Sequence, residues 1–528
     1  MKNILTTLAL ISIVYTSFAQ PNEDKKRDFN FFTGYESRNH TIAPVAGTTL
    51  TDFNYCPMQQ QFKNNPIDFV GSPAVMSDTA GRYLFSFNGY KIADSTYHIM
   101  ANGDSLCKPD YQSDEGSFII QGAITIPKPG SDHIYYIFHH LPTLTTITND
   151  PYAVLKGINI TTIDMQLNNG RGAVTSREVK TLRGDTLNSA VMKLCRHANG
   201  RDWWLIRPGL RLDKYYRLLI SPKGIDSLPA QIMPSPSLDS TYFSNYQEFS
   251  PDGSQYAHKI PNRGIFIYNF DRCSGLLSNR RFIPRFSQYF GEVYAGICFS
   301  PNSRYLYCNT DTSTIQYDTY APDIAASAIT VGLWDRTTVS PPRNYNTAFL
   351  QPFNAPNGKM YIAGPSTTQM WHTIHNPDGA GLSCDLRLHD VLLPTIYYGT
   401  VPNFPHFRLG ALKGTACDTL NIAAGATVAT SAAPLAAATL RGSLFPNPAD
   451  GSLTLGIDPS DNYTYDDNLP SGYTYTLSDV LGRVLRTESM ARERSSISTA
   501  ALPNGIYYVS VRRQGTVVFS GKVVVQHE

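Results

Sequence analysis

One short segment indicates the fold of this chain. It reads Phe249-Ser250-Pro251-Asp252-Gly253 and is followed closely by Gln255-Tyr256-Ala257. An apolar residue leads into a turn in which Pro presets φ and Asp-Gly accepts the positive φ angles of a tight hairpin. The residues after the turn have the composition of a strand. The same order of strand, turn and strand returns between residues 28 and 412, with turns at Ser77–Gly81, Lys128–Asp132, His197–Gly200, Ser300–Ser303 and Ala355–Gly358.

These hairpins recur about every 50 to 70 residues, which is the spacing of propeller blades and not of sandwich strands. Six blades are visible in this way. A seventh follows if the strand near Phe29–Phe32 pairs with the segment around Phe404–Phe407, because this pairing would close the ring and remove exposed sheet edges. We therefore expect an all-β chain whose residues 20–412 form a β-propeller of about seven blades, with six or eight as the alternatives.

The repeats also resemble known propeller sequences. Phe249–Gly253 and Phe299–Ser303 resemble the strand-turn-strand signature of tryptophan-aspartate-type and TolB-type propeller repeats. Other segments look like those of secreted propeller proteins that commonly carry a sorting tail, namely Ile126–Gly130 with Tyr135–Phe138, Asn269–Gly275 and Pro402–Pro405. These segments are turns and strands, so the resemblance implies a fold and not an activity.

The N-terminus has the features of an export signal. A basic residue, Lys2, precedes the apolar run Ile4–Val14, and small residues lead up to Ala19 and Gln20. This pattern predicts a secretory signal peptide over residues 1–19, cleaved between Ala19 and Gln20. The apolar run is too short to cross a bilayer, which takes about 20 apolar residues. We expect no transmembrane segment in the mature chain.

Composition narrows the class of protein further. The chain has 44 Lys and Arg against 42 Asp and Glu and no long basic block, so we expect no nucleic-acid partner. Aromatic residues make up 12% of the chain, and this abundance of strand formers beside many Gly and Pro favours an all-β protein. Eight cysteines occur without the spacing of a zinc site. Cys298 and Cys308 flank one predicted hairpin and could face each other in a disulfide.

The last part of the chain differs from the propeller repeats. Residues 413–442 are rich in Ala, Thr, Ser and Gly, which is the composition of a linker. The alternative is one Ala-rich helix, which the β-branched residues and Pro434 disfavour. After the linker, about seven short strands in residues 443–528 predict a small Ig-like β-sandwich.

Four motifs follow one another in this C-terminal domain: Phe-Pro-Asn-Pro, Asp-Val-Leu-Gly-Arg, Leu-Pro-Asn-Gly-Ile-Tyr and Lys-Val-Val-Val. They supply Pro446, Asn447, Pro448, Gly482, Arg483, Gly505, Ile506, Tyr507 and Lys522. In this order they closely resemble the type A C-terminal sorting domain of the type IX secretion system. The resemblance implies that the outer-membrane translocon recognises the tail and that a sorting protease removes it. The cargo is then released or attached to the cell surface.

Residue types that could carry chemistry form no recognisable catalytic or metal site. His139 and His140 are neighbours in a predicted strand and point to opposite faces, so they cannot bind one metal together. His372 and His375 lack a third ligand at a telling distance. No nucleophile elbow, phosphate loop or calcium loop occurs. We expect no catalytic residue, no metal and no cofactor.

Two weaker candidates for a site remain. Trp203 and Trp204 beside Arg201 could offer an aromatic platform to a sugar or a peptide, although packing inside a blade explains them as well. Glu248 and Glu292 could approach the central channel, where paired carboxylates do acid and base work. Nothing in the sequence places these two residues within reach of each other.

Three functions compete at this point. The leading hypothesis is an exported cell-surface or extracellular binding protein, not an enzyme, that recognises a glycan or a protein through loops on one face of the propeller. The alternative is a secreted hydrolase or lyase with its site in the propeller channel. The third is a purely structural matrix component.

Overall fold

The computed structural model divides the chain into two compact units, residues 1–421 and residues 422–528, which we describe separately. The residues that it describes are 26–35, 45–104, 106, 115–140, 143–147, 150–154, 157–181, 187, 191–209, 212–233, 246–261, 263–285, 295–339, 345–415, 417–418, 441–458, 473–479, 483–490, 494–513 and 516–527.

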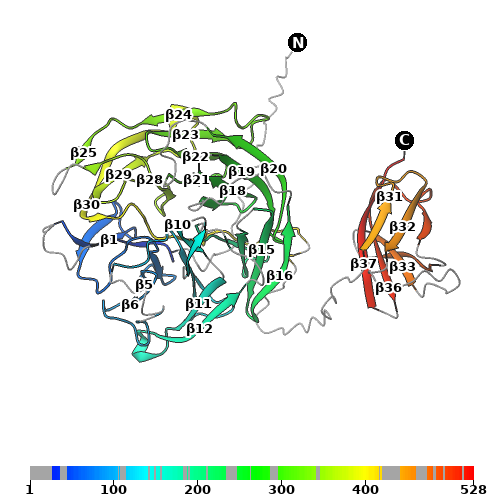
Figure 1. Cartoon of the computed structure of the whole chain (residues 1–528), viewed down its shortest axis with the longest axis horizontal. Coiled ribbons are helices and arrows are strands. Elements are labelled where there is room, and N and C mark those ends of the chain that lie inside the picture. Colours follow the sequence, from blue (N-terminus) through cyan, green and yellow to red (C-terminus); the bar gives the residue numbers. More distant parts are fainter. Residues whose placement is uncertain are drawn as a thin grey trace, which may run out of the picture. The chain divides into compact units, whose positions relative to one another are not determined.

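Seven antiparallel sheets of three or four strands form a ring in the described part of the first unit (Figure 1). Two are three-stranded: β1 (Asn30–Tyr35), β2 (Gly47–Asp52) and β3 (Gln59–Lys63), then β4 (Ala74–Ser77), β5 (Tyr83–Phe87) and β6 (Ile92–Asp94). The predicted seven-bladed propeller is confirmed.

Five blades have four strands. The first consists of β7 (Ala123–Pro127), β8 (Ile134–His139), β11 (Gly157–Asp164) and β12 (Ala173–Thr181). The second consists of β13 (Leu194–Arg196), β14 (Trp203–Pro208), β15 (Lys214–Ser221) and β16 (Gly224–Ile232). The third consists of β17 (Tyr246–Phe249), β18 (Gln255–Ile260), β19 (Gly264–Asp271) and β20 (Leu276–Pro284). The last two consist of β21 (Ile297–Phe299), β22 (Tyr305–Asn309), β23 (Ser313–Asp318) and β24 (Ile329–Leu333); β27 (Pro352–Asn354), β28 (Met360–Ala363), β29 (Thr368–Ile374) and β30 (Leu386–Tyr397).

Smaller elements lie in the connections. Two ribbons pair β9 (Thr143–Ile147) with β10 (Asp150–Val154) and β25 (Thr338–Val339) with β26 (Tyr345–Asn346). Two short 3-10 helices are η3 (Asn168–Gly170) and η4 (Gly381–Cys384).

Each of the six predicted hairpin turns joins the first strand of a blade to its second strand. In the turn after β17, Ser250 Oγ accepts a hydrogen bond from Gln255 N at 2.9 Å, and Gly253 has a φ of 71°. In the turn after β21, Ser300 Oγ accepts the same bond from Tyr305 N, also at 2.9 Å. The repeated Ser-Pro pattern therefore closes its own hairpin locally, which is why the sequence reveals it.

The propeller ring is closed by packing and not by a shared sheet, so the predicted pairing of Phe29–Phe32 with Phe404–Phe407 is wrong. Phe404–Phe407 is not a strand, since Pro405 removes a backbone donor that a ladder would need. The β1–β3 blade instead packs on the β27–β30 blade. Two hydroxyl pairs hydrogen-bond across this boundary, Tyr35 with Thr367 at 2.6 Å and Thr49 with Thr395 at 2.7 Å.

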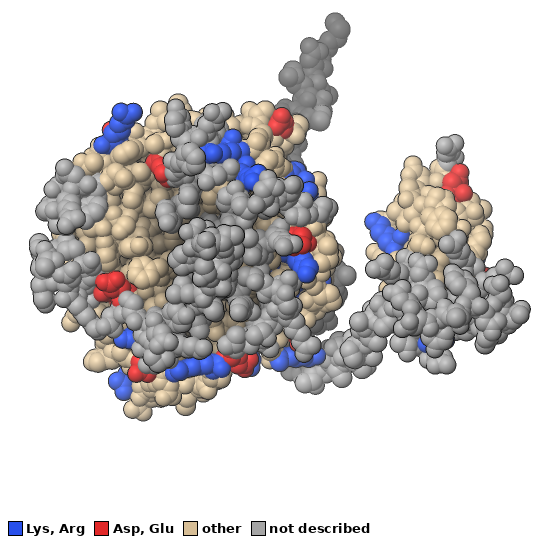
Figure 2. Space-filling view, in the orientation of Figure 1, with Lys and Arg blue, Asp and Glu red and all other residues tan. Residues whose placement is uncertain are grey.

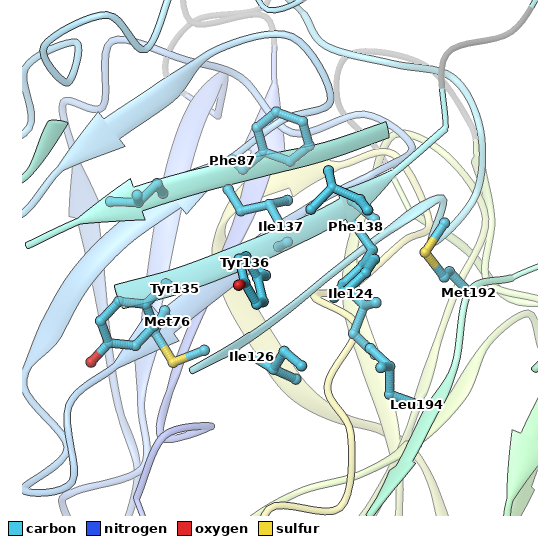
Figure 3. Packing of buried hydrophobic residues seen from close by; sticks show 14 of the residues in the cluster. Met76, Phe87, Ile124, Ile126, Tyr135, Tyr136, Ile137, Phe138, Met192 and Leu194 are labelled. Carbon is cyan, nitrogen blue, oxygen red and sulfur yellow. The ribbon is translucent and has the colours of Figure 1, made fainter. Parts of the chain in front are cut away.

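Both faces of a blade are buried between its neighbours. Tyr135 of β8 points toward the β4–β6 blade, where its ring lies edge-on to Phe85 with centroids 5.6 Å apart. Ile124 and Phe138, opposite each other in the register, point to the other face, toward Leu194 of the next blade (Figure 3). Burial on two sides explains why these strands are continuously apolar.

One disulfide is present among the described residues, between Cys273 and Cys417. Cys298 and Cys308, which the sequence allowed to face each other, form no disulfide, although the two residues lie on adjacent strands. Cys298 is directly opposite Tyr307, one residue before Cys308, so the two thiols point to opposite faces of the sheet.

The second unit is the predicted small β-sandwich. One sheet consists of β31 (Arg441–Phe445), β32 (Ser452–Asp458) and β35 (Arg494–Ser498), and the other consists of β34 (Val484–Ser489), β33 (Tyr473–Asp479), β36 (Gly505–Arg513) and β37 (Thr516–Val525). Leu455, Tyr475, Leu477, Val509 and Val523 are among the residues of the core between the sheets.

Candidate functional site

The channel of the propeller is lined by the first strands of the blades, and the chain itself enters it. We call residues 400–412, which follow β30 and its last blade, the channel segment. At its beginning, Thr400 Oγ1 donates to the carbonyl oxygen of Val70, just before β4. Asn403 Nδ2 lies 3.2 Å from the carbonyl of Ala123, the first residue of β7, and also bonds the carbonyl of Met192, just before β13. This half of the segment therefore lies where the first strands begin.

The second half of the channel segment lies where the first strands end. His406 Nε2 is 3.0 Å from the carbonyl oxygen of Phe249, the last residue of β17. Leu412 N donates to the carbonyl of Ala198 in the turn after β13, at 2.8 Å. Phe407, between them, is fully buried. The segment thus runs along the channel from one face of the propeller to the other, and it occupies the space where the alternative hypothesis puts a catalytic site.

Glu248 faces the channel, as the sequence allows, but neighbouring cationic side chains compensate its negative charge there. Its carboxylate is 2.8 Å from Lys193 Nζ and 3.7 Å from His406 Nε2, and its side chain is 7% exposed. Burial alone would raise the pKa of Glu248, yet Lys193 and His406 outweigh this effect and lower the pKa. A buried, paired and ionised carboxylate without a second carboxylate beside it is a structural ion pair. Glu292 lies outside the described residues.

The two residues of each histidine pair have different hydrogen-bond partners. His139 Nε2 is 3.1 Å from Thr161 Oγ1, and burial lowers the pKa of His139 to about 4, so it is neutral. His140 Nε2 is instead 3.1 Å from Nη2 of Arg207. His372 and His375 have different partners, the carbonyl of Thr347 and the carboxylate of Asp390. Within the described ranges, no three metal-ligating side chains come together.

The tryptophan pair is buried inside its blade. Trp203 is 1% exposed, and the guanidinium carbon of Arg196 lies over its ring, 4.1 Å from the ring centroid of Trp203. Trp204 is 2% exposed and its Nε1 donates to the carbonyl of Arg272 at 2.8 Å. Arg201 pairs with Asp202 at 2.7 Å. The structure therefore shows packing at these positions and no exposed aromatic face for a ligand.

The two faces of the propeller differ in how the chain crosses them. On the turn face, where first strands end, the chain reverses within the six hairpin turns; Ser77 ends β4 and Tyr83 begins β5. On the loop face, where first strands begin, a four-stranded blade passes the chain to the next blade; Ile232 ends β16 and Tyr246 begins β17. The connections between consecutive four-stranded blades therefore start and finish on the loop face.

In the sandwich, the Phe-Pro-Asn-Pro motif is bonded to the last strand. Asn447 Oδ1 accepts from Val524 N and its Nδ2 donates to the carbonyl of Lys522, both at 2.8 Å. Ala449 N donates to the carbonyl of Val524 at 2.8 Å, and the peptide bonds before Pro446 and Pro448 are cis. The asparagine side chain thus takes the place of a neighbouring strand beside the Lys-Val-Val-Val motif.

The other motifs meet at the same end of the sandwich. Arg483 Nε is 2.6 Å from Asp479 Oδ2 and closes the β33–β34 hairpin. Asp479 is directly opposite Tyr507, whose hydroxyl donates to the carbonyl of Pro503 at 2.9 Å. Gly505 is opposite Val525 in the register of β36 and β37. Gly482 lies outside the described residues. Four motifs that are far apart in the sequence therefore form one end of the domain.

Sequence reasoning missed the channel segment, with Asn403 and His406, and the lysine that neutralises Glu248. Pro402 and Pro405 were a usable signal, since two prolines within four residues argue against the strand that was expected there. Lys193 gave no signal, because its partner is 55 positions away in the chain. The predicted cleavage residues Ala19 and Gln20 and most of the linker lie outside the described residues.

The fold and these features define a β-propeller protein with a C-terminal β-sandwich. Residues 443–526 match the family described as secretion system C-terminal sorting domain, so the chain carries the sorting domain of type IX secretion. No described helix is long and apolar enough to cross a membrane. The sorting domain makes it a secreted or cell-surface protein.

Solved structures similar to this chain include two lactonases, one of them putative, and a β-propeller domain. A putative 6-phosphogluconolactonase of Bacteroides fragilis is 12% identical, with a TM-score of 0.36 over 71% of this chain and 98% of the other. A periplasmic gluconolactonase of Pseudomonas aeruginosa is 12% identical, with a TM-score of 0.39 over 71% and 97%. A β-propeller domain of Myceliophteria thermophila is 10% identical, with a TM-score of 0.34 over 60% and 86%. The likeness concerns the fold alone. No curated protein matches the chain.

Proposed function

We propose that the propeller is a binding module that acts outside the cell and holds a protein or polysaccharide partner on its loop face. The channel segment supports a binding role, because it contacts several blades from within the channel, where a channel enzyme would hold its substrate. Binding is thereby left to the outside of the propeller. Rigid blades that carry long connections on one face are a common scaffold for recognition.

The charge distribution supports a partner without strong charge. Described basic and acidic residues are interspersed around the face seen in Figure 2, and neither sign gathers into one patch. The net charge of the chain is only +2. Long-range steering of a highly charged partner needs a field of one sign, so a neutral glycan or a protein of mixed charge fits better.

The route out of the cell completes the proposal. Residues 1–19 act as a cleaved signal peptide for the inner membrane, and the sorting domain is recognised at the outer-membrane translocon and then removed by a sorting protease. We expect the linker to leave the propeller on the turn face. The disulfide between Cys273 and Cys417 fixes the chain there, beside the turn after β19. Removal of the tail beyond this anchor leaves the propeller intact.

The binding role is tested with residues 20–421 on arrays of glycans and of extracellular proteins. Once a ligand is found, residues 234–245, which join β16 to β17, are replaced by a short Gly-Ser linker, and we expect affinity to fall at least tenfold. The matched control replaces exposed turn-face residues, Thr79 and Asn357, by alanine and should bind normally. Turnover of a substrate by the protein, or binding that depends on the turn face, would contradict the proposal.

The export role is tested by deleting residues 443–528 in a bacterium that has this secretion system. The truncated protein should accumulate in the periplasm, since it has lost its address for the outer membrane. Its normal appearance in the medium or on the cell surface would show that the tail is not needed.

A further inference from the structure

The outer face of the four-stranded sheet in the sorting domain changes character along its strands. One row of directly paired neighbours across the sheet carries only hydroxyl side chains: Thr487, Thr476, Ser510 and Ser520. Two residues further along β33, β36 and β37, toward the end where the four motifs meet, the outward residues are Ser478, Tyr508 and Lys522, and Val484 of β34 lies opposite Ser478. This end carries Val484, Tyr508, Ile506 and Val524, which we call the apolar row.

The apolar row is exposed although the sandwich has a well-filled interior. Val484 is 63% exposed, Tyr508 47% and Ile506 39%. The residues that alternate with them on β36 point inward, and Tyr507 and Val509 are 7% and 0% exposed. A sandwich of this size gains nothing in stability from an exposed tyrosine beside two exposed aliphatic residues. Contiguous apolar side chains on a surface usually mark a contact with another molecule.

Register makes the row contiguous. Ser478 is directly opposite both Val484 and Tyr508, and Tyr508 is directly opposite Lys522. Ile506 is directly opposite Val524 in the next outward pair. Side chains in such pairs lie within about 5.5 Å at Cβ. The apolar side chains therefore come from β34, β36 and β37, β33 contributes Ser478, and the exposed Lys522 lies directly beside Tyr508.

Motif residues at this end fall into two groups. Asn447, Arg483 and Tyr507 form hydrogen bonds within the domain and hold its end together. Ile506 and Lys522 belong to the same motifs, yet their side chains point away from the core and toward solvent. The first group builds the end of the domain and the second group is presented by it.

We propose that the apolar row with Lys522 is the surface on which an outer-membrane component of the secretion machinery holds the sorting domain. The partner presents an apolar surface with an acidic group opposite Lys522. This inference rests on the sorting role of the domain and adds the face that is recognised. Apolar contact desolvates the tyrosine and the aliphatic side chains, and the single cation sets the register of the contact.

A photo-crosslinking experiment identifies the occupant directly. In the full chain, Tyr508 is replaced by a photo-reactive phenylalanine analogue; in the matched control, Ser510 on the same face of the same strand is replaced. Cells that have the secretion system are irradiated during export, and adducts are identified by mass spectrometry. We expect an adduct with an outer-membrane component of the machinery, at least tenfold stronger from position 508 than from position 510.

Three results would overturn the proposal. They are an adduct of position 508 with a second copy of this chain, an adduct with the propeller of the same chain, and machinery adducts of equal strength from positions 508 and 510. Each result gives the row a different occupant or no special role.

A secretion assay separates the face from the domain. Tyr508→Lys should lower the amount of protein outside the cell at least tenfold, whereas Ser510→Lys should leave it unchanged, and both full-length variants should keep the thermal midpoint of the sandwich. If deletion of residues 443–528 blocks export but Tyr508→Lys is exported normally, the proposed face is wrong and the sorting role stands. If the deletion has no effect, the sorting role itself fails. Should Tyr508→Lys not fold, the crosslinking result decides.

Discussion

Replacing Phe407 by alanine tests whether the channel segment is part of the propeller core. Phe407 is fully buried, and its ring lies edge-on to Trp203 with centroids 5.9 Å apart. Truncation removes the ring and leaves a cavity beside Trp203. The blades cannot collapse into it, because each is held between two neighbours. A buried Phe→Ala change of this kind costs about 3–5 kcal/mol.

This loss translates into a shift in melting temperature. Near 60 °C the unfolding entropy is about 2.1 cal/mol/K per residue, so a unit of roughly 400 residues has an unfolding entropy of about 0.8 kcal/mol/K. A loss of about 4 kcal/mol therefore lowers Tm by about 5 °C. Differential scanning calorimetry of the full chain, read at the transition of larger enthalpy, measures the shift.

The matched control is Lys413→Ala, which truncates an exposed residue just beyond the channel segment and should leave Tm unchanged. Phe407→Leu should fall between the two, since it keeps most of the apolar volume. A Tm for Phe407→Ala within about 1 °C of the original protein would mean that the channel segment contributes little to the fold. The filled channel would then be no argument against a site there.

Three further predictions concern buried charges and the disulfide. Glu248→Gln leaves Lys193 buried without its counter-ion, so urea unfolding should show a loss of about 3–5 kcal/mol. Because the pKa of Glu248 is lowered, its contribution is complete above the ordinary glutamate pKa of about 4.3 and is lost as the pH falls through the lowered value. Cys417→Ser opens a loop of 144 residues and should cost about 5 kcal/mol, with no further loss when Cys273→Ser is added. Burial lowers the pKa of His258 to about 3, so stability should fall as the pH drops below about 6.5, by roughly 4 kcal/mol at pH 3; His258→Gln should flatten this decline in urea midpoints.

Local turn chemistry made the propeller predictable. The Ser-Pro-Asp-Gly turn at residues 250–253 uses Ser250 and Gly253 to close a hairpin within six residues, and such a turn forms in the same way wherever it occurs. Six hairpin turns at blade spacing, two of them with this Ser-Pro pattern, therefore indicated a propeller. The existence of a seventh blade was predicted, but the pairing of its strands was not. The β1–β3 blade lacks a turn of this pattern, and its place depends on packing against β30.

The sorting domain was predicted from motifs whose spacing is read directly from the chain. Their meeting at one end was not predictable, since it follows from the register of β33, β36 and β37. The same limit applies to cysteines. Cys298 and Cys308 looked suitable for a bridge by position, but a shift of one residue in register sends their side chains to opposite faces.

Sequence alone therefore established the hairpin repeat, the all-β class and the sorting tail, because each depends on residues that are near neighbours in the chain. Tertiary structure decided how the channel is filled, which carboxylate is neutralised and which face of the tail is apolar. Asn403 meets the carbonyl of Met192 across 211 positions, and Glu248 meets Lys193 across 55. Contacts of this kind arise only when the blades have closed into a ring, and no local pattern of residues records them.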